Sequence, residues 1–402
     1  MNSNDTYLST KIRYKNNSLK KLSKEFNKIY FNVKNEINEK NTTLSVLSKK
    51  FKFNFKIKDL KKFKKFKTLA IIGMGGSILG SMAIHNFLET KIKKKVYFFD
   101  DINEKKIIDF KKKENLKKVL FLIISKSGNT VETLSNIFAL KILKKKAKNI
   151  IIVAEKKNNS LLSMSKKLEL FYVEHKNFIG GRYSLFSETG IIPAYLMGVN
   201  IIKLRSNILS VIKDKNKSLL RDSSLKLASI LMSKKLNNLI FLNYSPQLEQ
   251  FLYWCQQLVA ESLGKKNKGF LPMISNAPKD HHSLLQLYLD GPKDKLFYIF
   301  SCEEKARNNI DVNSDVSKNS YLNKKYLHQI KLAQKNALIR ALNKNKIPFK
   351  EFIIKKIDEK TLGSLFSYFI FETVIIGKLL KINPYDQPAV EQVKVFTKNL
   401  LT

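Results

Sequence analysis

The chain has 402 residues, of which 44% are hydrophobic and 27% are charged, and it contains two cysteines. This profile allows about two domains of ordinary size, and it excludes a disordered chain and a small scaffold stapled by disulfides. The net charge is +42, but only six of the 75 basic residues are arginines and the lysines are scattered along the chain. Because arginine best recognises phosphates and base edges, we expect no specific nucleic-acid partner.

Residues 1–66 are polar, rich in lysine and weakly periodic, which predicts an N-terminal helical segment. The first thirty residues lack the apolar core of a signal peptide, so we expect a cytoplasmic protein. The longest apolar stretch, Leu362 to Leu380, contains Glu372 and Lys378. It therefore predicts a buried core helix and no membrane partner.

From residue 67 onward, short apolar runs alternate with stretches long enough for helices. Strands are predicted at 68–73, 96–100, 119–125, 151–154 and 170–173, and helices near 76–90, 103–115, 130–146 and 160–168. After a pause around 200–235, strands are predicted at 239–244, 271–275, 296–301 and 349–356, and helices before 263, near 321–344, over 359–381 and from 386. This alternation predicts two α/β domains with mainly parallel sheets, at 67–210 and 211–384, and a C-terminal helix at 385–402.

The segment GMGGS (73–77) follows a predicted strand and precedes a helix. Glycines let the backbone approach a ligand closely, and a helix N-terminus offers N–H groups to an anion. A dinucleotide fingerprint would need glycine at position 78, where Ile78 stands, although Asp100 and Asp101 close the next strand as a ribose-binding acid would. A nicotinamide dehydrogenase and a plain strand-to-helix turn therefore remain alternatives.

The segment SKSGNTVE (125–132) follows a continuous apolar strand. Its three hydroxyls, its glycine and the start of a helix form a good cradle for a small phosphate, although the segment does not match a Walker loop. The alternative is ordinary helix capping, in which Asn129 and Glu132 form a capping box. The two readings are compatible because both use the first N–H groups of the helix.

Two further, separate candidates are an arginine and a glutamate with a neighbouring glutamine. Arg182 follows two glycines in GGRYS, where a fixed guanidinium suits developing negative charge. Gln257 and Glu261 are four residues apart and share a helical face, with Glu261 in the last turn, a position that suits a base. A surface arginine after a turn and a solvated glutamate are the alternatives.

The last candidates are the segments DHHS (280–283) and DQPAVEQVK (386–394). Asp280 and Asp386 are predicted to cap helices, and Gln387, Glu391 and Lys394 share one helical face. Capping histidines and an ion-paired terminal helix are the alternatives. Neither HExxH nor CxxC occurs, so we expect no metal.

The order and spacing of these motifs resemble the phosphoglucose isomerase family, in its shorter bacterial form. GMGGS, SKSGNTVET, GGRYS, a helix with Q-x-x-x-E-S-x-G-K, DHHS and DQPAVEQVK follow one another from about Ala70 to Lys394. The resemblance implies two sugar-isomerase (SIS) domains, each a three-layer αβα sandwich with a mainly parallel sheet, and terminal helices that wrap around them. It also implies a homodimer in which one histidine comes from the partner subunit, and reversible conversion of glucose 6-phosphate to fructose 6-phosphate without metal or cofactor.

The resemblance also implies roles for single residues. Glu261 is expected to move the proton between C2 and C1, and Arg182 to stabilise the enediolate. His282, in preference to His281, and Lys394 are expected to open the sugar ring. The remaining expected substrate-binding residues are Gly76, Ser77, Ser125, Lys126, Ser127, Thr130, Glu132, Gln257 and Gln387.

Two other functions stay open. Related enzymes combine this activity with mannose 6-phosphate isomerisation, so a bifunctional phosphoglucose/phosphomannose isomerase is one alternative. The other is a noncatalytic regulator that binds sugar phosphates through SIS domains. The joint presence of Glu261, His282 and Lys394 argues against the regulator, which would not need them.

Overall fold

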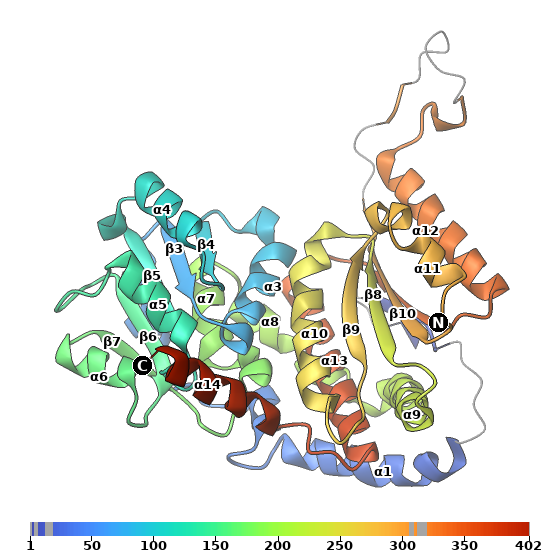
Figure 1. Ribbon diagram of the computed structural model, residues 1–402, viewed down its shortest axis with the longest axis horizontal. Coiled ribbons are helices and arrows are strands. Elements are labelled where there is room, and N and C mark those ends of the chain that lie inside the picture. Colours follow the sequence, from blue (N-terminus) through green and yellow to red (C-terminus); the bar gives the residue numbers. More distant parts are fainter. Residues whose placement is uncertain (1, 4–6, 13–18, 305–308, 312–319, 402) are drawn as a thin grey trace.

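The computed structural model describes residues 2–3, 7–12, 19–304, 309–311 and 320–401. Figure 1 shows two lobes, each built around its own sheet, with the long helix α1 (Leu19–Glu36) running along the base of the second lobe. The fold class predicted from the sequence is confirmed, since both sheets are mainly parallel and have helices packed on them.

The first sheet has five parallel strands in the order β4-β3-β5-β6-β7. The strands are β3 (Thr68–Ile72), β4 (Lys95–Phe99), β5 (Val119–Ile124), β6 (Ile150–Glu155) and β7 (Phe171–His175). Their helices are α3 (Leu79–Phe87), α4 (Glu104–Lys113), α5 (Val131–Leu140), α6 (Ser160–Lys167) and α7 (Glu188–Met197). Every residue of β5 and β6 is buried, which explains their continuous apolar sequences.

The second sheet has the order β1-β2-β11-β10-β8-β9. Its parallel strands are β8 (Asn238–Asn243), β9 (Leu271–Asn276), β10 (Lys295–Cys302) and β11 (Phe349–Ile354). Its helices are α9 (Lys217–Ser233), α10 (Glu249–Leu263), α11 (Leu285–Leu289), α12 (Leu327–Lys344) and α13 (Glu359–Leu379). The short helix α8 (Ile201–Ser206) and α9 occupy the region where the strand–helix alternation was predicted to pause.

The N-terminal segment holds α1 and the one-turn helix α2 (Ile57–Leu60), in keeping with its helical prediction. It also contributes two strands that the prediction lacked, β1 (Asn2–Ser3) and β2 (Tyr7–Ser9). Strand β2 pairs antiparallel with β11, about 345 residues later in the chain. The start of the chain is thereby attached to the edge of the second sheet.

Helix α13 is long and apolar enough to cross a membrane by length and composition alone. In this fold 94% of its apolar window is buried, as the prediction of a core helix requires. It contacts α8, α9 and α10, and it also packs against α1. The apolar sequence of α13 is therefore explained by its position at the centre of the second lobe.

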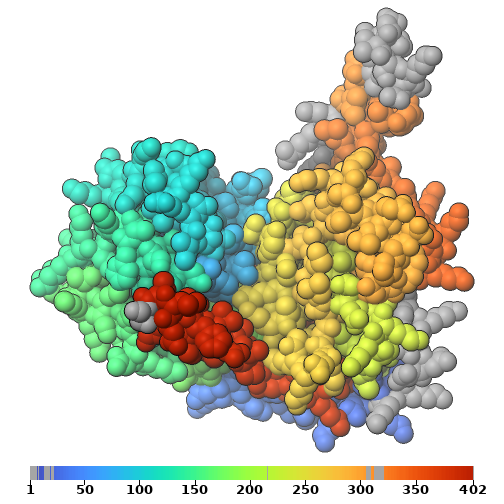
Figure 2. Space-filling model, in the orientation of Figure 1, coloured from blue at the N-terminus to red at the C-terminus, as the bar shows by residue number. Residues whose placement is uncertain are grey.

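The C-terminal helix α14 (Glu391–Leu401) has no buried residue and is exposed at every position except the half-buried Thr397. Figure 2 shows the C-terminal segment, in red, lying on the front of the molecule over the first lobe and leading back to the second. Its apolar side chains include Val393, Phe396 and Leu400, which are all more than half exposed.

Candidate active site

The topology of the first sheet brings two of the predicted segments together. The chain leaves β3 towards β4 on one side and leaves β5 towards β6 on the other. The loops after β3 and β5 therefore diverge at the carboxyl edge of the sheet, which is where open parallel sheets bind ligands. These loops carry GMGGS (73–77) and SKSGNT (125–130).

The loop after β5 is held by its own hydroxyl groups. Ser125 and Thr130 Oγ atoms are 2.8 Å apart, and those of Ser127 and Thr130 are 3.4 Å apart. Ser125 Oγ also accepts a hydrogen bond from the Gly128 N–H at 3.2 Å. The three hydroxyls thus gather at the start of α5, with Glu132 half-buried in its first turn. This cluster of hydroxyls at a helix N-terminus can hold a phosphate.

The ammonium of Lys126, in the same loop, contacts the turn after β7. Lys126 Nζ donates to the Asn177 carbonyl at 2.9 Å and lies 3.5 Å from Glu155. Burial lowers the pKa of Lys126, because its charged form loses hydration. The contact joins the loop after β5 to the turn after β7.

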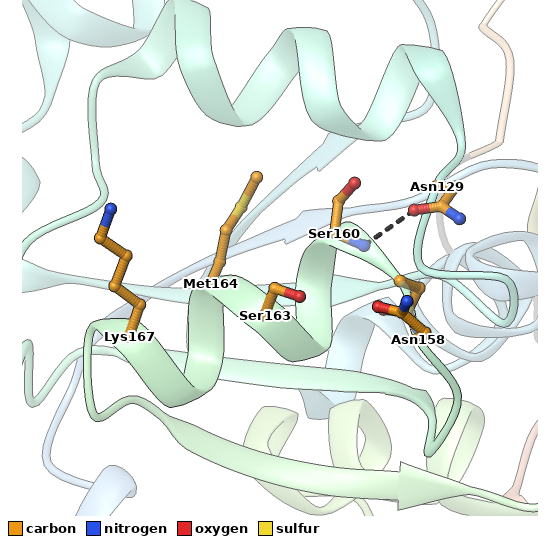
Figure 3. A pocket seen from close by; sticks show the side chains of 7 residues that line it. Asn129, Asn158, Ser160, Ser163, Met164 and Lys167 are labelled. Atoms are coloured by element: carbon orange, nitrogen blue, oxygen red, sulfur yellow. Dashed lines mark hydrogen bonds between the residues drawn. The ribbon is translucent and has the colours of Figure 1, made fainter.

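The start of α6 is hydrogen-bonded to the same loop, and Figure 3 shows the contact between Asn129 and Ser160. Asn129 Oδ1 accepts a hydrogen bond from the Ser160 N–H at 2.8 Å, and the Gly128 carbonyl accepts one from the Leu161 N–H at 3.2 Å. The predicted capping box is therefore wrong: Asn129 bonds to α6, and the N-cap of α5 is Thr130, without a side-chain cap. An open surface pocket of about 520 Å³ lies beside this contact, between Asn129 and Lys167.

Gly128 is needed for this arrangement. Its φ of +69° is in the left-handed region, and a Cβ atom there would lie 2.0 Å from Asn159 Oδ1. Asn159 is itself fully engaged, since its amide donates to the Glu155 and Lys157 carbonyls and its oxygen accepts from the Leu162 N–H.

The loop after β3 touches the arginine segment directly. A Cβ atom on Gly76 would lie 2.1 Å from the Gly181 carbonyl carbon and 2.5 Å from the Arg182 nitrogen. Ser77 completes the same short turn, Gly75–Ser77, and is half-buried. A glycine at 76 therefore allows the backbone of the GMGGS loop to lie against the backbone that carries Arg182.

Arg182 is 2% exposed, and each of its five N–H groups has an acceptor. Nε donates to Ser262 Oγ at 2.7 Å. Nη2 donates to the carbonyls of Pro384 (2.7 Å) and Asp386 (2.9 Å). Nη1 donates to the side chains of Glu261 (3.1 Å) and Gln387 (2.9 Å). The buried guanidinium is thus held by main-chain carbonyls at Nη2 and by side chains at Nη1 and Nε.

Glu261 and Gln257 lie on one face of α10, as the spacing predicted. Gln257 Nε2 donates to Glu261 Oε1 at 2.9 Å, while Arg182 binds the other carboxylate oxygen. The Gln257 amide also lies against Gly75, where a Cβ atom would come within 2.7 Å of Nε2. The structure therefore brings together Arg182, Gln257, Glu261 and Gln387, next to the GMGGS loop.

The two histidines lie elsewhere. His281 and His282 are in the turn Lys279–His282 after β9, and His282 is exposed. Asn276, at the end of β9, contacts Glu249 in the first turn of α10, whereas Glu261 is in its last turn. Twelve residues of helix separate the two glutamates by about 18 Å. Within one chain, the histidine turn and Glu261 are thus at opposite ends of α10.

The contacts in the histidine turn differ from the predicted helix cap. Asp280 accepts from the Asn276 N–H at 2.7 Å and from Ser275 Oγ at 3.0 Å, while Pro278 occupies the N-cap position. His281 Nε2 lies 2.7 Å from the Tyr244 hydroxyl, and burial lowers the pKa of His281. His281 is therefore engaged within its own lobe, unlike its exposed neighbour His282.

Lys394 is exposed on α14, and its ammonium lies 2.6 Å from Glu391 Oε1. Gln387, and not the predicted Asp386, occupies the N-cap position before the turn Pro388–Val390. The side chain of Asp386 instead accepts from Lys265 Nζ at 2.6 Å. Among the described residues, no group of three or more His, Cys, Asp and Glu side chains is placed to hold a metal ion.

The comparisons with known proteins show the family of the chain. Residues 22–274 match the family model of phosphoglucose isomerase, which is more than half of the chain. The chain belongs to the phosphoglucose isomerase family. The glucose-6-phosphate isomerase of Methanocaldococcus jannaschii is 33% identical over 346 residues, which cover 82% of this chain and 83% of that relative. A probable glucose-6-phosphate isomerase of Methanococcus maripaludis is 34% identical over 352 residues, with 84% and 80% covered.

Solved structures give the same fold. The glucose-6-phosphate isomerase of Chlamydia trachomatis superposes with a TM-score of 0.80 at 17% identity, with 99% of this chain and 89% of that chain covered. A hypothetical protein of Thermus thermophilus reaches a TM-score of 0.83 at 24% identity, with 96% of both chains covered. The phosphoglucose isomerase resemblance stated from the motifs is therefore confirmed, as is the predicted fold class. The roles of single residues stay predictions.

Three residues of this site were not singled out from the sequence. Ser262 accepts from Arg182 Nε, and Tyr183 hydroxyl lies 2.9 Å from the same Ser262 oxygen. Trp254 Nε1 donates to the Arg182 carbonyl at 3.1 Å. Ser262 is the serine of the Q-x-x-x-E-S-x-G-K motif, so its position beside Glu261 was the available signal. The Tyr183 and Trp254 contacts span 79 and 72 residues and have no local signature.

Proposed function

We propose that this phosphoglucose isomerase interconverts glucose 6-phosphate and fructose 6-phosphate, with Glu261 as the base and Arg182 as the cation that stabilises the enediolate. The observation that carries the proposal is the 3.1 Å contact between Arg182 Nη1 and Glu261 Oε2, beside the GMGGS loop. Isomerisation needs a base for the proton and a positive charge where the oxyanion develops, and the proximity of a carboxylate and a guanidinium supports this proposal.

In the proposed mechanism, Glu261 takes the proton from C2 of the open-chain aldose and returns it to C1. The electron pair left on carbon forms the enediolate, whose oxyanion is stabilised by Arg182. Gln257 holds one oxygen of Glu261, which leaves the carboxylate in a fixed orientation for transfer in both directions. One proton leaves C2 and one is returned to C1, while the hydroxyl proton on O2 passes to O1 of the same substrate, so the isomerisation balances without a cofactor.

The substrate phosphate is proposed to bind in the loop after β5, through Ser125, Ser127 and Thr130. The −2 charge would meet the positive end of the α5 dipole and three hydroxyl donors. Lys126 is proposed to bind the phosphate with these hydroxyls, Glu132 to orient the loop, and Gly76, Ser77 and Gln387 to bind the sugar. Binding energy from the phosphate would then position the reacting carbons at Glu261.

Ring opening is proposed to use His282 and Lys394. Because His282 lies at the far end of α10 from Glu261 in its own chain, we propose a homodimer in which the histidine comes from the second copy. Lys394 would act from α14, which follows Gln387 closely in the sequence.

A cytoplasmic enzyme without a nucleic-acid or membrane partner fits the scattered lysines and the buried α13. We also propose that the chain divides after residues 66, 210 and 384, because each of the two central segments contains the parallel strands of one sheet.

The test measures conversion of fructose 6-phosphate to glucose 6-phosphate by the purified protein, with a chelator present. Wild type is compared with Glu261→Gln and with Glu39→Gln, a matched change at an exposed glutamate after α1. We expect turnover in wild type and Glu39→Gln and its collapse in Glu261→Gln. Sugar-phosphate binding without turnover in wild type would instead favour the regulator, and turnover in Glu261→Gln would remove the base from its role.

A further inference from the structure

Lys265, two residues after the end of α10, makes three short contacts outside the reacting groups. Its side chain is 13% exposed. Its Nζ donates to the Asn383 carbonyl at 2.5 Å, the Asp386 carbonyl at 2.6 Å and Asp386 Oδ1 at 2.6 Å. An ammonium has three N–H groups, so all three are directed at the loop 383–386. The neighbouring Lys266 is exposed.

The same loop holds Arg182. The Pro384 and Asp386 carbonyls accept both hydrogen bonds from Arg182 Nη2. The Asp386 carbonyl is therefore shared between two cations, Arg182 and Lys265. The Asp386 carboxylate accepts from Lys265 Nζ and from the Asn383 amide, and its hydrogen bond with Lys265 is the main reason that the pKa of Asp386 is lowered.

Lys265 also has a fixed relationship to the proposed base. It is four residues after Glu261, at the same end of α10. One end of α10 thus carries the carboxylate that contacts Arg182 and the ammonium that holds the loop behind Arg182. An ion pair whose carboxylate is half exposed adds little to folding by itself, so a role in stability alone does not account for this convergence.

From this convergence we propose that Lys265 is a positioning residue for Arg182. By holding the Asp386 carbonyl and carboxylate, it fixes the loop 383–386 against the guanidinium and so sets the distance between Arg182 and Glu261. Lys265 touches no reacting group, because its donors are all directed at the loop. This inference rests on the proposed function for its consequence in catalysis, but the contact itself does not.

The kinetic test compares Lys265→Met, which keeps the aliphatic stem, with Lys266→Met as the matched control. Asp386→Asn removes the negative charge of the other partner in the Lys265–Asp386 ion pair. We expect kcat to fall about 10- to 100-fold in Lys265→Met and Asp386→Asn, because a small misplacement of a catalytic group has effects of this size. KM should stay within about two-fold, since the phosphate loop is not altered. Equal kcat in Lys265→Met and Lys266→Met, or a change in KM alone, would overturn the proposal.

A second measurement does not depend on isomerase activity. The chain has six arginines, so the Nε–H signals of arginine side chains can be followed by NMR in labelled full-length protein. We expect the Arg182 signal to shift and to exchange faster with solvent in Lys265→Met and Asp386→Asn, and to stay unchanged in Lys266→Met. An unchanged signal in both variants would overturn the inference. If wild type lacks isomerase activity, the proposed function fails, while this measurement still decides the role of Lys265.

Discussion

Gln387 accepts through Oε1 a hydrogen bond from Arg182 Nη1 at 2.9 Å, next to the bond that Nη1 donates to Glu261. The Nη2 acceptors are main-chain carbonyls, whereas both Nη1 acceptors are side chains that can rotate. Nη1 is therefore the nitrogen from which a substrate oxygen can take over a hydrogen bond. The remaining donors stay bound and keep the guanidinium in place.

This relationship predicts that Arg182→Lys loses catalysis even though the charge is kept. A lysine cannot replace the fork, so Ser262 and the Pro384 and Asp386 carbonyls would lose donors. We expect kcat to fall about 100- to 1000-fold, as for removal of an oxyanion donor. The free energy of unfolding, from urea titration, should fall by about 1–3 kcal/mol. Arg340→Lys, at an exposed position, is the control, and full activity in Arg182→Lys would contradict this role.

The contact between the GMGGS loop and the Arg182 segment predicts different effects for alanine at Gly76 and at Gly181. A methyl group on Gly76 meets backbone atoms at 2.1 Å, whereas one on Gly181 has only Gly76 Cα nearby, at 3.7 Å. We expect Gly76→Ala to lose about 3 kcal/mol of stability and most of its activity, because backbone must move. Gly181→Ala should lose less than about 0.5 kcal/mol. Similar denaturant midpoints for the two variants would show that the loops are not packed as described.

Gly128→Ala tests the phosphate loop. The substitution combines a left-handed φ of +69° with a collision at Asn159 Oδ1. We expect KM for fructose 6-phosphate to rise about 10-fold or more, equivalent to about 1.4 kcal/mol of binding. Gly198→Ala is the matched control, since it has φ +93° but no atom within 4 Å of the added methyl. The control should lose about 1 kcal/mol of stability and keep its KM. An unchanged KM in Gly128→Ala would separate this loop from the substrate phosphate.

Buried His175 predicts how stability depends on pH. Burial lowers the pKa of His175 to about 4, and Nδ1 lies 4.0 Å from the equally buried Glu188. As pH falls below the ordinary histidine pKa of about 6.5, His175 becomes protonated in the unfolded chain but stays neutral in the folded chain. Stability should therefore fall by about 1 kcal/mol per pH unit between about pH 6.5 and 4.

The measurement is urea unfolding at several pH values, for wild type and His175→Gln. The variant should lose this part of the pH dependence whatever its absolute stability is. The same slope in both proteins over this pH range would contradict a neutral, buried His175.

The sequence predicted the strands well and their long-range partners poorly. The apolar run of β5 is buried on both faces, so its composition alone identified it. Helix α5 was expected to continue to 146 but ends at Leu140, where Lys141 adopts a left-handed conformation that no glycine or proline announces. The pairing of β2 with β11 depends on contacts between the two ends of the chain, which no local pattern encodes.

The sequence likewise predicted the local features of the candidate site and missed its long-range contacts. Local spacing correctly placed Gln257 and Glu261 on one face and the three hydroxyls at one helix start. The contacts that hold Arg182 come from the loop 383–386, about 200 residues away, and could not be read from spacing. The separation of His282 from Glu261 was likewise invisible, because it depends on the direction of α10 in the lobe.

The most direct test of the central claim, proton transfer by Glu261, is isomerisation in deuterium oxide followed by NMR. Because the proton held by Glu261 exchanges with solvent before it is returned to carbon, an enediolate route with a carboxylate base predicts that wild type introduces deuterium at C2 of glucose 6-phosphate and at C1 of fructose 6-phosphate. Glu261→Gln should bind the sugar phosphates and introduce none over the same period. Deuterium exchange in Glu261→Gln at the rate of wild type would contradict the assignment of Glu261 as the base.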